Sequence, residues 1–345
     1  MDHQGFMDII SGRRRGVGAA AARGGLAAAS VPYAAAVNLR RCLYHKGVLR
    51  RYRAAVPVIS VGNITTGGTG KTPMVAWIVR ELIDAGARPA VLMRGYKAAG
   101  GVSDEAELLK RLTGCEVLAD ADRVAAAGRA ASGGADVLVM DDGFQHLRLG
   151  RDLDVVLIDT MNPFGYGRVL PRGLLREPVA ALRDAGAIVL TRCNGVTSGQ
   201  IETLDRRLGE LAPRASRHRA LHRAVMLIDP SGAQRPLRAL AGRRVMAFCG
   251  IGNPEAFFAT VDEVGVDPVA CVALADHEAY GRAVLDRLRQ AARACKAESL
   301  LTTEKDHVKL AAADLGSGVW RLVVAMEVVH ARDELIERIR GVLRR

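Results

Sequence analysis

Residues 65–72 read TTGGTGKT, shortly after the apolar run Val56–Val61 and just ahead of the helix-like stretch Pro73–Ile83. Closely spaced glycines let backbone NH groups close around a polyphosphate. The lysine can reach the β and γ oxygens, and the last threonine, at a helix N-terminus, can ligate Mg²⁺. The stretch therefore predicts a phosphate-binding loop for a nucleoside triphosphate, built from Thr65, Thr66, Gly67, Gly68, Thr69, Gly70, Lys71 and Thr72.

One position departs from the strict phosphate-loop pattern. The pattern has glycine six residues before the lysine, and this chain has Thr65 there. The competing interpretation is a glycine-rich turn whose lysine is solvated. The order of strand, Gly-Gly-Thr-Gly-Lys-Thr and helix favours the phosphate-binding loop.

Composition and charge limit the number of domains, the cellular compartment and the kinds of partner that the sequence suggests. The 345 residues suit one large α/β domain or two smaller ones. The six cysteines, at 42, 115, 193, 249, 271 and 295, show no CxxC pair, which fits a reducing compartment. Residues 1–53 hold ten basic and two acidic residues, a net +8 of the chain's +12. Because the body is only mildly basic and aromatic residues are 4%, we expect no nucleic-acid partner.

The N-terminal segment has the pattern of a membrane-surface helix. The Ala-rich stretch Gly16–Asn38 is too weakly apolar to span a bilayer, and Arg23 and Pro32 interrupt it. No signal peptide is evident. We expect an amphipathic segment on an anionic membrane surface; the alternative is an ordinary surface helix after a disordered basic start. The flanking basic residues are Arg13, Arg14, Arg15, Arg40, Arg41, Lys46, Arg50, Arg51 and Arg53.

Beyond the loop, short apolar runs alternate with amphipathic stretches, which predicts a P-loop NTPase-type parallel sheet with helices on both faces. Expected strands are Val56–Val61, Pro89–Met93, Val137–Met140, Val155–Ile158, Ile188–Leu190, Val245–Cys249, Leu300–Thr302 and Leu322–Ala325. Expected helices are Pro73–Ala85, Asp104–Leu112, Asp122–Ala131, Gln200–Leu211, Pro254–Val264, Tyr280–Cys295 and Asp333–Leu343.

The passage from Pro213 to Ala241 shows little strand signal and marks a soft boundary. We therefore expect three parts: a membrane-associating segment over residues 1–53, a P-loop core over 54–212, and a smaller C-terminal α/β region over 213–345 that completes the substrate cleft.

A second chemical landmark lies at Val137–Met140, an apolar run that ends in Asp141 and Asp142. A carboxylate at the carboxyl end of a buried strand beside a phosphate loop can hold Mg²⁺. The run and its two aspartates are therefore interpreted as a Walker B strand. Adjacent residues project to opposite sides of a strand, so one aspartate is expected to face the metal. Alone, the pair could equally cap a helix.

Several segments of the chain carry a further signal when taken together. They are VGNITTGGTGKTP at 61–73, RGY at 94–96, SDEAELL at 103–109, DDGFQHLRLGRDLDVVLID at 141–159, GRVLPRGLLREP at 167–178 and TEKDHVKL at 303–310. In this order they resemble one family, the tetraacyldisaccharide 4'-kinases, or lipid A 4'-kinases. The resemblance implies a kinase that uses ATP and Mg²⁺ to phosphorylate the 4'-hydroxyl of a lipid disaccharide 1-phosphate. It also implies a peripheral or monotopic protein on the cytoplasmic face of the bacterial inner membrane.

The resemblance further implies the catalytic residues. Asp104 matches the family's catalytic aspartate, and His277 matches the histidine thought to partner it, with Lys71 as the third catalytic residue. From the residues alone, a cap of the helix Glu105–Leu112 is the favoured interpretation of Asp104, and a lone loop histidine is more often a surface or satisfied polar residue. The metal ligands are expected to be Thr72, Asp142 and Asp141.

Substrate contacts are expected from Arg94, Tyr96, Arg176 and Glu177. Arg168, Arg172 and Arg176 recur every four residues and can hold the lipid 1-phosphate or the ATP phosphates; the alternative is a solvated basic loop. The chain departs from the family pattern at Met93, Lys97 and Ser103, so a hydroxyl role at position 93 is not expected.

Two other classes compete with the kinase. The loop also resembles that of partition and metallochaperone switch ATPases, but those usually carry a lysine where this chain has Thr66. A nucleotide-binding membrane scaffold would keep Lys71 and tolerate loss of Asp104. Lipid-dependent ADP release is expected of the kinase, lipid-independent release of the switch ATPase and none of the scaffold.

Overall fold

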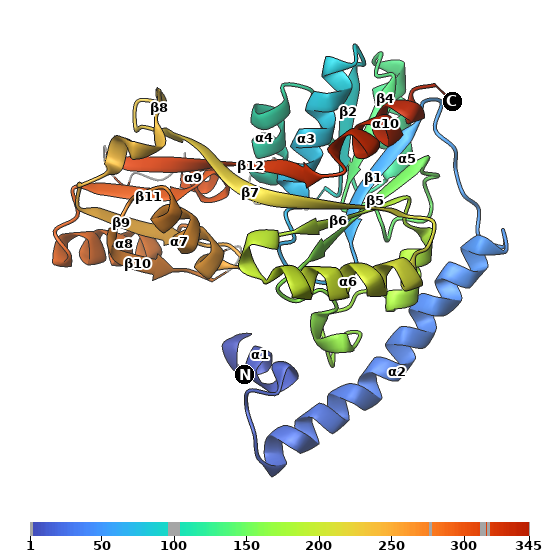
Figure 1. Ribbon diagram of the computed structural model, residues 1–345, viewed down its shortest axis with the longest axis horizontal. Coiled ribbons are helices and arrows are strands. Elements are labelled where there is room, and N and C mark those ends of the chain that lie inside the picture. The colour runs from blue at the N-terminus through green and yellow to red at the C-terminus, as the bar shows by residue number, and fades with distance from the viewer. Residues whose placement is uncertain (1–2, 96–103, 276–277, 311–314, 316–317, 345) are drawn as a thin grey trace. The chain divides into compact units, whose positions relative to one another are not determined.

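The structure is a computed structural model that describes residues 3–95, 104–275, 278–310, 315 and 318–344 (Figure 1). It contains two compact units. Unit 1 comprises Met1–Tyr96, Cys115–Leu221 and Val328–Arg345, and unit 2 comprises Lys97–Gly114 and His222–Glu327. The chain passes from one unit to the other four times, after Tyr96, after Gly114, and within two long strands, β7 (Ser216–Ile228) and β12 (Val319–His330).

Unit 1 is built on a parallel sheet with the strand order β7-β6-β5-β1-β4-β2-β3. Its strands pair in parallel throughout, and those between the two ends of this order are almost fully buried, as expected where helices cover both faces. Besides β7, they are β1 (Val58–Asn63), β2 (Pro89–Met93), β3 (Glu116–Ala119), β4 (Val137–Asp141), β5 (Leu153–Asp159) and β6 (Ala187–Thr191).

Two helices cover each face of this sheet. Helices α5 (Arg123–Ser132) and α6 (Ser198–Leu211) pack on the face that Leu138, Met140, Val156 and Ile188 share. Helices α3 (Lys71–Asp84) and α10 (Arg332–Val342) pack against β1, β4 and β5 and against each other. Because α3 follows β1 immediately, the β1–α3 turn lies at the carboxyl edge of the sheet, where parallel α/β sheets bind ligands.

The N-terminal helices belong to unit 1. A short helix α1 (His3–Ser11) precedes α2 (Val17–His45), which is continuous through Arg23 and Pro32. Its buried residues include Ser30 and Arg41. No helix among the described residues is long and apolar enough to cross a membrane. The helix predicted in the N-terminal segment is present as α2.

In unit 2, the strands β10 (Pro268–Ala273), β9 (Val245–Cys249), β11 (Ser299–Thr303) and β12 pair in parallel in that order. The short β8 (Gln234–Arg235) pairs antiparallel with β7. Helix α7 (Pro254–Glu263) packs on one face of β9, and α8 (Arg282–Ala294) and α9 (Glu304–Leu310) pack on the other. Helix α4 (Asp104–Thr113) contacts α9. Short 3₁₀ turns in the chain are Gly165–Gly167, Val179–Asp184, Cys193–Gly195 and Leu237–Leu240.

The predicted α/β fold class with a parallel sheet and helices on both faces is confirmed, and every expected strand and helix is present. Their ends lie within two residues of the prediction, except that the strand expected at Leu322–Ala325 is the longer β12, Val319–His330. The expectation of little strand signal over residues 213–241 was wrong, because β7 runs for 13 residues there. Its sequence, SRHRALHRAVMLI, carries five basic side chains, which hid the alternation of apolar residues. The three-part division 1–53, 54–212 and 213–345 stays a prediction.

Candidate active site

The predicted phosphate loop links Asn63, the last residue of β1, to Lys71, the first residue of α3. Gly67 and Gly70 have φ angles of +110° and +88°, in the region that residues with a Cβ rarely adopt. Gly67 and Gly68 are exposed, whereas Thr69 is buried. The loop therefore presents its glycine backbone to solvent at the N-terminus of a helix, which is the arrangement that binds phosphate.

One side of the loop is held by the segment after β5. The Thr66 amide donates to the Leu174 carbonyl oxygen at 2.8 Å, and Thr65 forms an antiparallel bridge with Leu175. These backbone contacts fix the first half of the loop to the GRVLPRGLLREP segment.

The other side is held by the end of β6. The Thr191 hydroxyl donates to the Thr69 carbonyl oxygen at 3.1 Å. Arg192 donates to the Gly68 carbonyl oxygen and pairs with Asp159, the last residue of β5. The carbonyl oxygens of Gly68 and Thr69 therefore accept hydrogen bonds from the end of β6, which fixes the second half of the loop.

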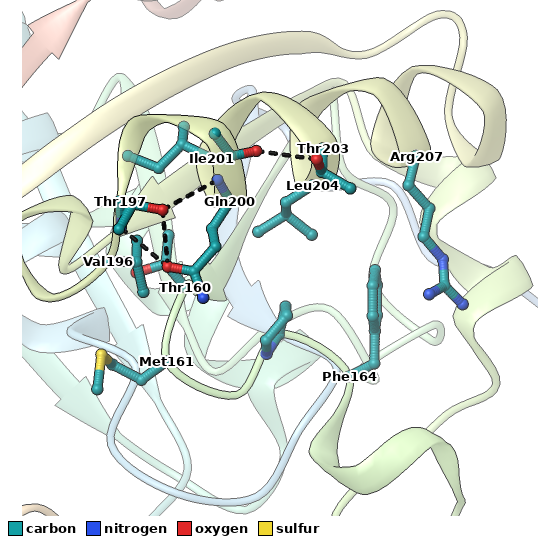
Figure 2. Close-up of a pocket in the computed structure, with 12 residues that line it drawn as sticks. Thr160, Met161, Phe164, Val196, Thr197, Gln200, Ile201, Thr203, Leu204 and Arg207 are labelled. Carbon is teal, nitrogen blue, oxygen red and sulfur yellow. Dashed lines mark hydrogen bonds between the residues drawn. The ribbon is translucent and has the colours of Figure 1, made fainter.

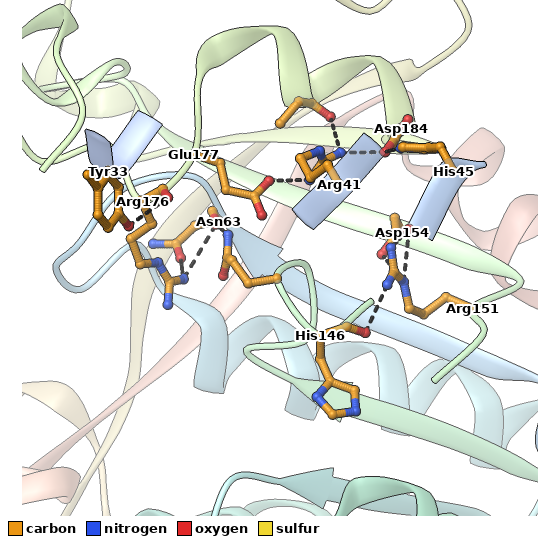
Figure 3. Close-up of polar contacts among 12 residues, drawn as sticks. Tyr33, Arg41, His45, Asn63, His146, Arg151, Asp154, Arg176, Glu177 and Asp184 are labelled. Carbon is orange, nitrogen blue, oxygen red and sulfur yellow. Dashed lines mark hydrogen bonds and ion pairs between the residues drawn. The ribbon is translucent and has the colours of Figure 1, made fainter. Parts of the chain in front are cut away.

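Four side chains converge beside the loop. Arg176 makes a bidentate ion pair with Asp142, with Nη2–Oδ1 and Nη1–Oδ2 distances of 2.6 and 2.9 Å. Lys71 Nζ lies 3.5 Å from Asp142 Oδ1 and 3.5 Å from Asn63 Oδ1, and Arg176 also donates to Asn63 Oδ1. Figure 3 shows Arg176 reaching Asn63. The predicted residues Lys71, Asp142 and Arg176 are therefore brought together.

The positively charged side chains around Asp142 keep its carboxyl group ionised. Burial alone would raise the pKa of its carboxyl group, but the hydrogen bonds from Arg176 and the charges of Lys71, Arg176 and Arg123 outweigh burial. The pKa therefore lies well below its ordinary value. Arg123 also donates to the Asp142 carbonyl oxygen at 3.0 Å. The carboxylate stays ionised at neutral pH.

Asp141 is the last residue of β4 and is 6% exposed. It pairs in register with Val61 and lies on the opposite face of the strand from Met140, which packs with α5. Asp141 is therefore on the α3 face, and Asp142, with a φ of +50°, turns away from regular strand geometry.

The oxygen donors here suit Mg²⁺. Thr72 is the second residue of α3, and Asp141 and Asp142 end the neighbouring strand. Among the described residues, no group of three or more His, Cys, Asp or Glu side chains forms a metal cluster. Few protein ligands, all of them oxygens, fit an ion that keeps several waters and is bound mainly through phosphates.

The structure describes only some of the residues that were predicted to act on the substrate that accepts the phosphoryl group. Asp104 begins α4 in unit 2, and its side chain lies outside the described residues, as do Tyr96 and His277. Arg94 is exposed just after β2. Near Asp104, Lys305 Nζ lies 3.5 Å from the Glu105 carboxylate.

Glu177 is 1% exposed and is engaged within the protein. Its carboxylate pairs with Arg41 of α2, which also pairs with Asp184 (Figure 3). Burial raises the pKa of Glu177, and the positive charges of Arg41 and Arg40 oppose that shift. Glu177 thus anchors α2 to the segment that holds the phosphate loop.

Sequence reasoning missed Asn63, Arg123 and Arg192. Asn63 accepts hydrogen bonds from Lys71 and Arg176, and Arg192 closes the loop from β6. The signal for Asn63 was its place at the end of β1, two residues before the loop. Arg192 had no signal, because its partner Gly68 lies 124 residues away.

A cavity of about 630 Å³ lies between the segment after β5 and the first half of α6 (Figure 2). The Thr160 hydroxyl lies 3.0 and 2.9 Å from the carbonyl oxygens of Thr191 and Arg192. The Arg207 guanidinium lies over the Phe164 ring, 4.5 Å from its centroid. The cavity therefore adjoins the strand end that holds the phosphate loop.

The parallel sheet, the glycine loop before α3 and the aspartates at the end of β4 define a P-loop phosphate-binding protein. A family model described as Tetraacyldisaccharide-1-P 4'-kinase matches residues 23–344. The chain belongs to this family. The predicted kinase class is confirmed, and the switch-ATPase alternative falls outside it.

Named relatives agree over most of the chain. A tetraacyldisaccharide 4'-kinase of Geobacter metallireducens is 43% identical, covering 83% of this chain and 88% of the relative. That of Syntrophus aciditrophicus is 42% identical, covering 82% and 83%. The crystal structure of LpxK from Aquifex aeolicus in complex with ATP has a TM-score of 0.73 and 28% identity, covering 93% of this chain and 99% of that one.

Proposed function

We propose that this protein transfers the γ-phosphoryl group of ATP to the 4'-hydroxyl of a tetraacyldisaccharide 1-phosphate, a step of lipid A biosynthesis. The observation that carries the proposal is the convergence of Lys71 and Arg176 on Asp142 beside an exposed glycine loop. Phosphoryl transfer needs positioning and charge neutralisation more than covalent chemistry. Lys71 and the loop amides supply both to the ATP phosphates.

Mg²⁺ would be held by Thr72 with Asp142 or Asp141, and when bound it neutralises charge on the transferring phosphate. In this proposal Arg176 lies at the phosphates, because its guanidinium already lies beside Asp142 and within reach of the same region as Lys71. Arg94, Tyr96 and Glu177 remain proposed for the substrate side, with Glu177 acting through Arg41 and the position of α2.

On the acceptor side, Asp104 is proposed to receive the proton of the sugar hydroxyl, with His277 as its partner. This part rests on the match of Asp104, in SDEAELL, and of Asp276 and His277 to the family's pattern. Asp104→Asn is expected to slow turnover without changing ATP affinity, because the residue would act on the acceptor and not on the nucleotide.

We propose that α2 lies on an anionic membrane surface, at the cytoplasmic face of the inner membrane. Uncharged, exposed residues recur on α2 at spacings of three or four, so they share one helix face. They are Val17, Ala21, Gly24, Ala28, Val31, Ala35, Leu39 and Cys42. Val17, Val31 and Leu39 are 88%, 67% and 60% exposed. The basic residues at both ends of α2 suit anionic headgroups.

The kinase proposal is tested with purified protein, ATP, Mg²⁺ and tetraacyldisaccharide 1-phosphate in mixed micelles. We expect ADP release that depends on the lipid, and a 4'-phosphorylated product in mass spectrometry. ADP release that ignores the lipid would instead indicate a switch ATPase. No release would indicate a nucleotide-binding scaffold.

The membrane proposal is tested with Val31→Asp, measured by sedimentation with phosphatidylglycerol vesicles. Removing a valine from the apolar contact costs about 1.5 kcal/mol, roughly tenfold in partitioning. Ala29→Glu is the matched control, because Ala29 is exposed on α2 but points about 120° away from Val17. Equal losses for both variants would argue against a defined membrane face.

A further inference from the structure

The segment TEKDHVKL at 303–310 has no role in the proposed function. It runs from Thr303, the last residue of β11, through helix α9 in unit 2 (Figure 1). Asp306 within this segment is 0% exposed. Because a fully buried carboxylate is tolerated only where nearby donors satisfy it, the partners of Asp306 indicate what it holds in place.

The carboxylate of Asp306 accepts hydrogen bonds from the ends of two strands. The amide of Gly250, which follows β9, donates to Asp306 Oδ2 at 2.9 Å, and the Thr303 hydroxyl donates to the same oxygen at 2.8 Å. The Asp306 amide donates in return to Thr303 Oγ1 at 3.0 Å. Asp306 Oδ1 lies 3.5 Å from Lys309 Nζ, and the Lys309 side chain is 9% exposed. Asp306 therefore ties β9 to β11 at the carboxyl edge of the strands of unit 2.

Gly250 lies against the residues that follow β10, the neighbour of β9 at the same edge. A Cβ atom on Gly250 would lie 3.2 Å from the Ala275 carbonyl oxygen and 3.2 Å from Asp306 Oδ1. The Leu274 amide donates to the Cys249 carbonyl oxygen at 2.8 Å. The backbone after β9 and the backbone after β10 are therefore in close contact, and the hydrogen bond to Asp306 sets the position of the first.

The residues after β10 lead into Asp276 and His277, which lie outside the described residues. The described residues on either side of this pair are joined to each other. The Glu278 amide donates to the Ala275 carbonyl oxygen at 3.1 Å, and the Ala275 amide donates to Glu278 Oε2 at 3.0 Å. Ala275, which directly precedes the pair, is thus held by Glu278 and by its contact with Gly250.

Helix α9 also contacts α4, the helix that begins at Asp104. Lys305 Nζ lies 3.5 Å from Glu105 Oε1. One short helix therefore contacts α4 through Lys305 and, through Asp306, holds the backbone that packs against Ala275. These are the two segments that lead to the residues proposed to act on the sugar hydroxyl.

We propose that Asp306 is a positioning residue for phosphoryl transfer, and that it acts through Gly250 and Ala275 on the segment Asp276–His277. The inference rests on the proposed function, in which His277 is the partner of Asp104. Misplacing a reacting group by about 1 Å can cost about 100-fold in rate, so a fixed backbone before His277 matters for turnover. The alternative is that Asp306 only caps α9 and stabilises unit 2.

The first test is Gly250→Ala, with Gly281→Ala as the matched control. The added methyl group at Gly250 meets the Ala275 carbonyl oxygen, whereas a Cβ atom on Gly281 meets no atom within 4 Å. We expect kcat for lipid phosphorylation to fall at least about tenfold in Gly250→Ala, at unchanged KM for ATP. Gly281→Ala is expected to match the wild type. An unchanged kcat in Gly250→Ala overturns the positioning role.

The second test compares Asp306→Ala with Asp306→Asn. Alanine removes the acceptor of the Gly250 amide, whereas asparagine keeps an acceptor oxygen for that amide and loses the ion pair with Lys309. We expect kcat to fall at least about tenfold in Asp306→Ala and to return to within about threefold of wild type in Asp306→Asn. If the two variants lose kcat equally, the hydrogen bond to Gly250 does not position the segment and the proposal fails.

Thr302→Val is the control for a loss of stability alone. Thr302 is fully buried on β11, and its hydroxyl donates to the Phe248 carbonyl oxygen at 2.8 Å, a contact that involves neither Gly250 nor Ala275. We expect a lower melting temperature at wild-type kcat. A loss of kcat as large as that of Asp306→Ala would show that any weakening of unit 2 slows turnover, and would overturn the assignment to Asp306.

A double variant shows whether the effect passes through His277. In the His277→Ala background the position of this side chain no longer matters, so adding Gly250→Ala is expected to lower kcat by less than about twofold. A further loss of about tenfold in the double variant would show that Gly250 acts independently of His277, and would overturn the proposed route.

Hydrogen exchange separates this inference from the proposed function. In the full chain without ligands, we expect a peptide that covers Leu274 and Ala275 to exchange faster in Asp306→Ala than in wild type or Asp306→Asn. Equal exchange in all three overturns the hold of Asp306 on this backbone, whatever the activity. If wild type phosphorylates the lipid and every variant keeps its kcat, the positioning role fails and the function stands. If wild type does not phosphorylate the lipid, the proposed function fails and the catalytic part of this inference fails with it.

Discussion

The arginines beside the phosphate loop and the arginines that line a groove along α2 differ in their partners. Beside the loop, Arg176 pairs with Asp142 and Arg192 pairs with Asp159, and both ion pairs are partly buried. In the groove of about 410 Å³ between α2 and the segment from Gly167 to Val179, Arg168 and Arg172 belong to the lining and make no ion pair within the described part of the chain. The Arg172 guanidinium donates to the Ile10 carbonyl oxygen. Arg168 and Arg176 come from one short segment, so the difference lies in what the fold places opposite each of them.

The two regions therefore differ in which groups could contact an anion. Around the loop the backbone amides and Lys71 provide the binding groups, and ion pairs hold the surrounding scaffold in place. In the groove the two guanidinium groups have no acidic partner among the described residues. Substitutions near the loop are therefore expected to affect both stability and chemistry, whereas substitution of the exposed Arg168 is expected to leave stability nearly unchanged.

The largest effect is expected for Lys71→Ala. Lys71 lies beside Asp142 at the loop, so its loss removes a charge that stabilises the transferring phosphate. We expect turnover to fall by at least about 100-fold. Steady-state ADP release measures it, with the melting temperature as control. Near-normal turnover would rule out a phosphate-binding role for the loop lysine.

Arg41→Ala tests the anchor between α2 and the loop segment. Arg41 is 8% exposed and pairs with Glu177 and Asp184, so its removal leaves the buried Glu177 carboxylate unpaired. Breaking such a pair costs about 3–5 kcal/mol. We expect faster hydrogen exchange in α2 and a lower unfolding free energy in urea titrations.

Arg53→Ala is the matched control for this anchor. Its guanidinium is 88% exposed and lies 4.0 Å from Asp152, so we expect a change within about 0.5 kcal/mol. If the two alanine variants lose equal stability, the buried anchor does not hold α2.

The contrast between paired and unpaired arginines is tested by Arg176→Gln and Arg168→Gln. Loss of the bidentate contact with Asp142 is expected to lower the unfolding free energy by about 2 kcal/mol. Arg168→Gln is expected to change it by less than about 0.5 kcal/mol. Urea unfolding at pH 7.5 measures both. Equal stability losses would remove the distinction between the two regions.

A pH dependence is expected from His146, which ends the DDGFQH segment. Burial, helped by nearby arginines, lowers the pKa of His146 from 6.5 to about 4. In the folded protein the imidazole stays neutral between these values while the unfolded chain takes up a proton. Stability from this residue is therefore complete above pH 6.5 and decreases as the pH falls from 6.5 toward 4.

We expect His146→Gln to lose less stability than wild type between pH 7.5 and 5.0 in urea titrations. His330→Gln is the control, because His330 is exposed on β12. Parallel pH dependence of wild type and His146→Gln would show that the neutral imidazole contributes nothing to this slope.

Much of the fold could be predicted because its signals are local. Buried parallel strands such as β2 and β4 are nearly continuous apolar runs. Glycines such as Gly67 and Gly70 indicate loop positions where φ can be positive. The strand β7 escaped prediction because its basic residues break the apolar pattern. Of the candidate site, Lys71 and Asp142 were found from their motifs, while Asn63 and Arg192 carry no motif of their own.

The order of residues alone determined the phosphate loop, the Asp-Asp strand end and the alternation of strands and helices, because each depends on neighbours within a few positions. Only the tertiary structure decided that Arg176 binds Asp142, that Glu177 holds Arg41, and that Arg168 is left facing a groove. These partners lie 34 to 136 residues apart. Spacing along the chain cannot specify such pairs, because the packing of α2 and the strand order determine which charges meet.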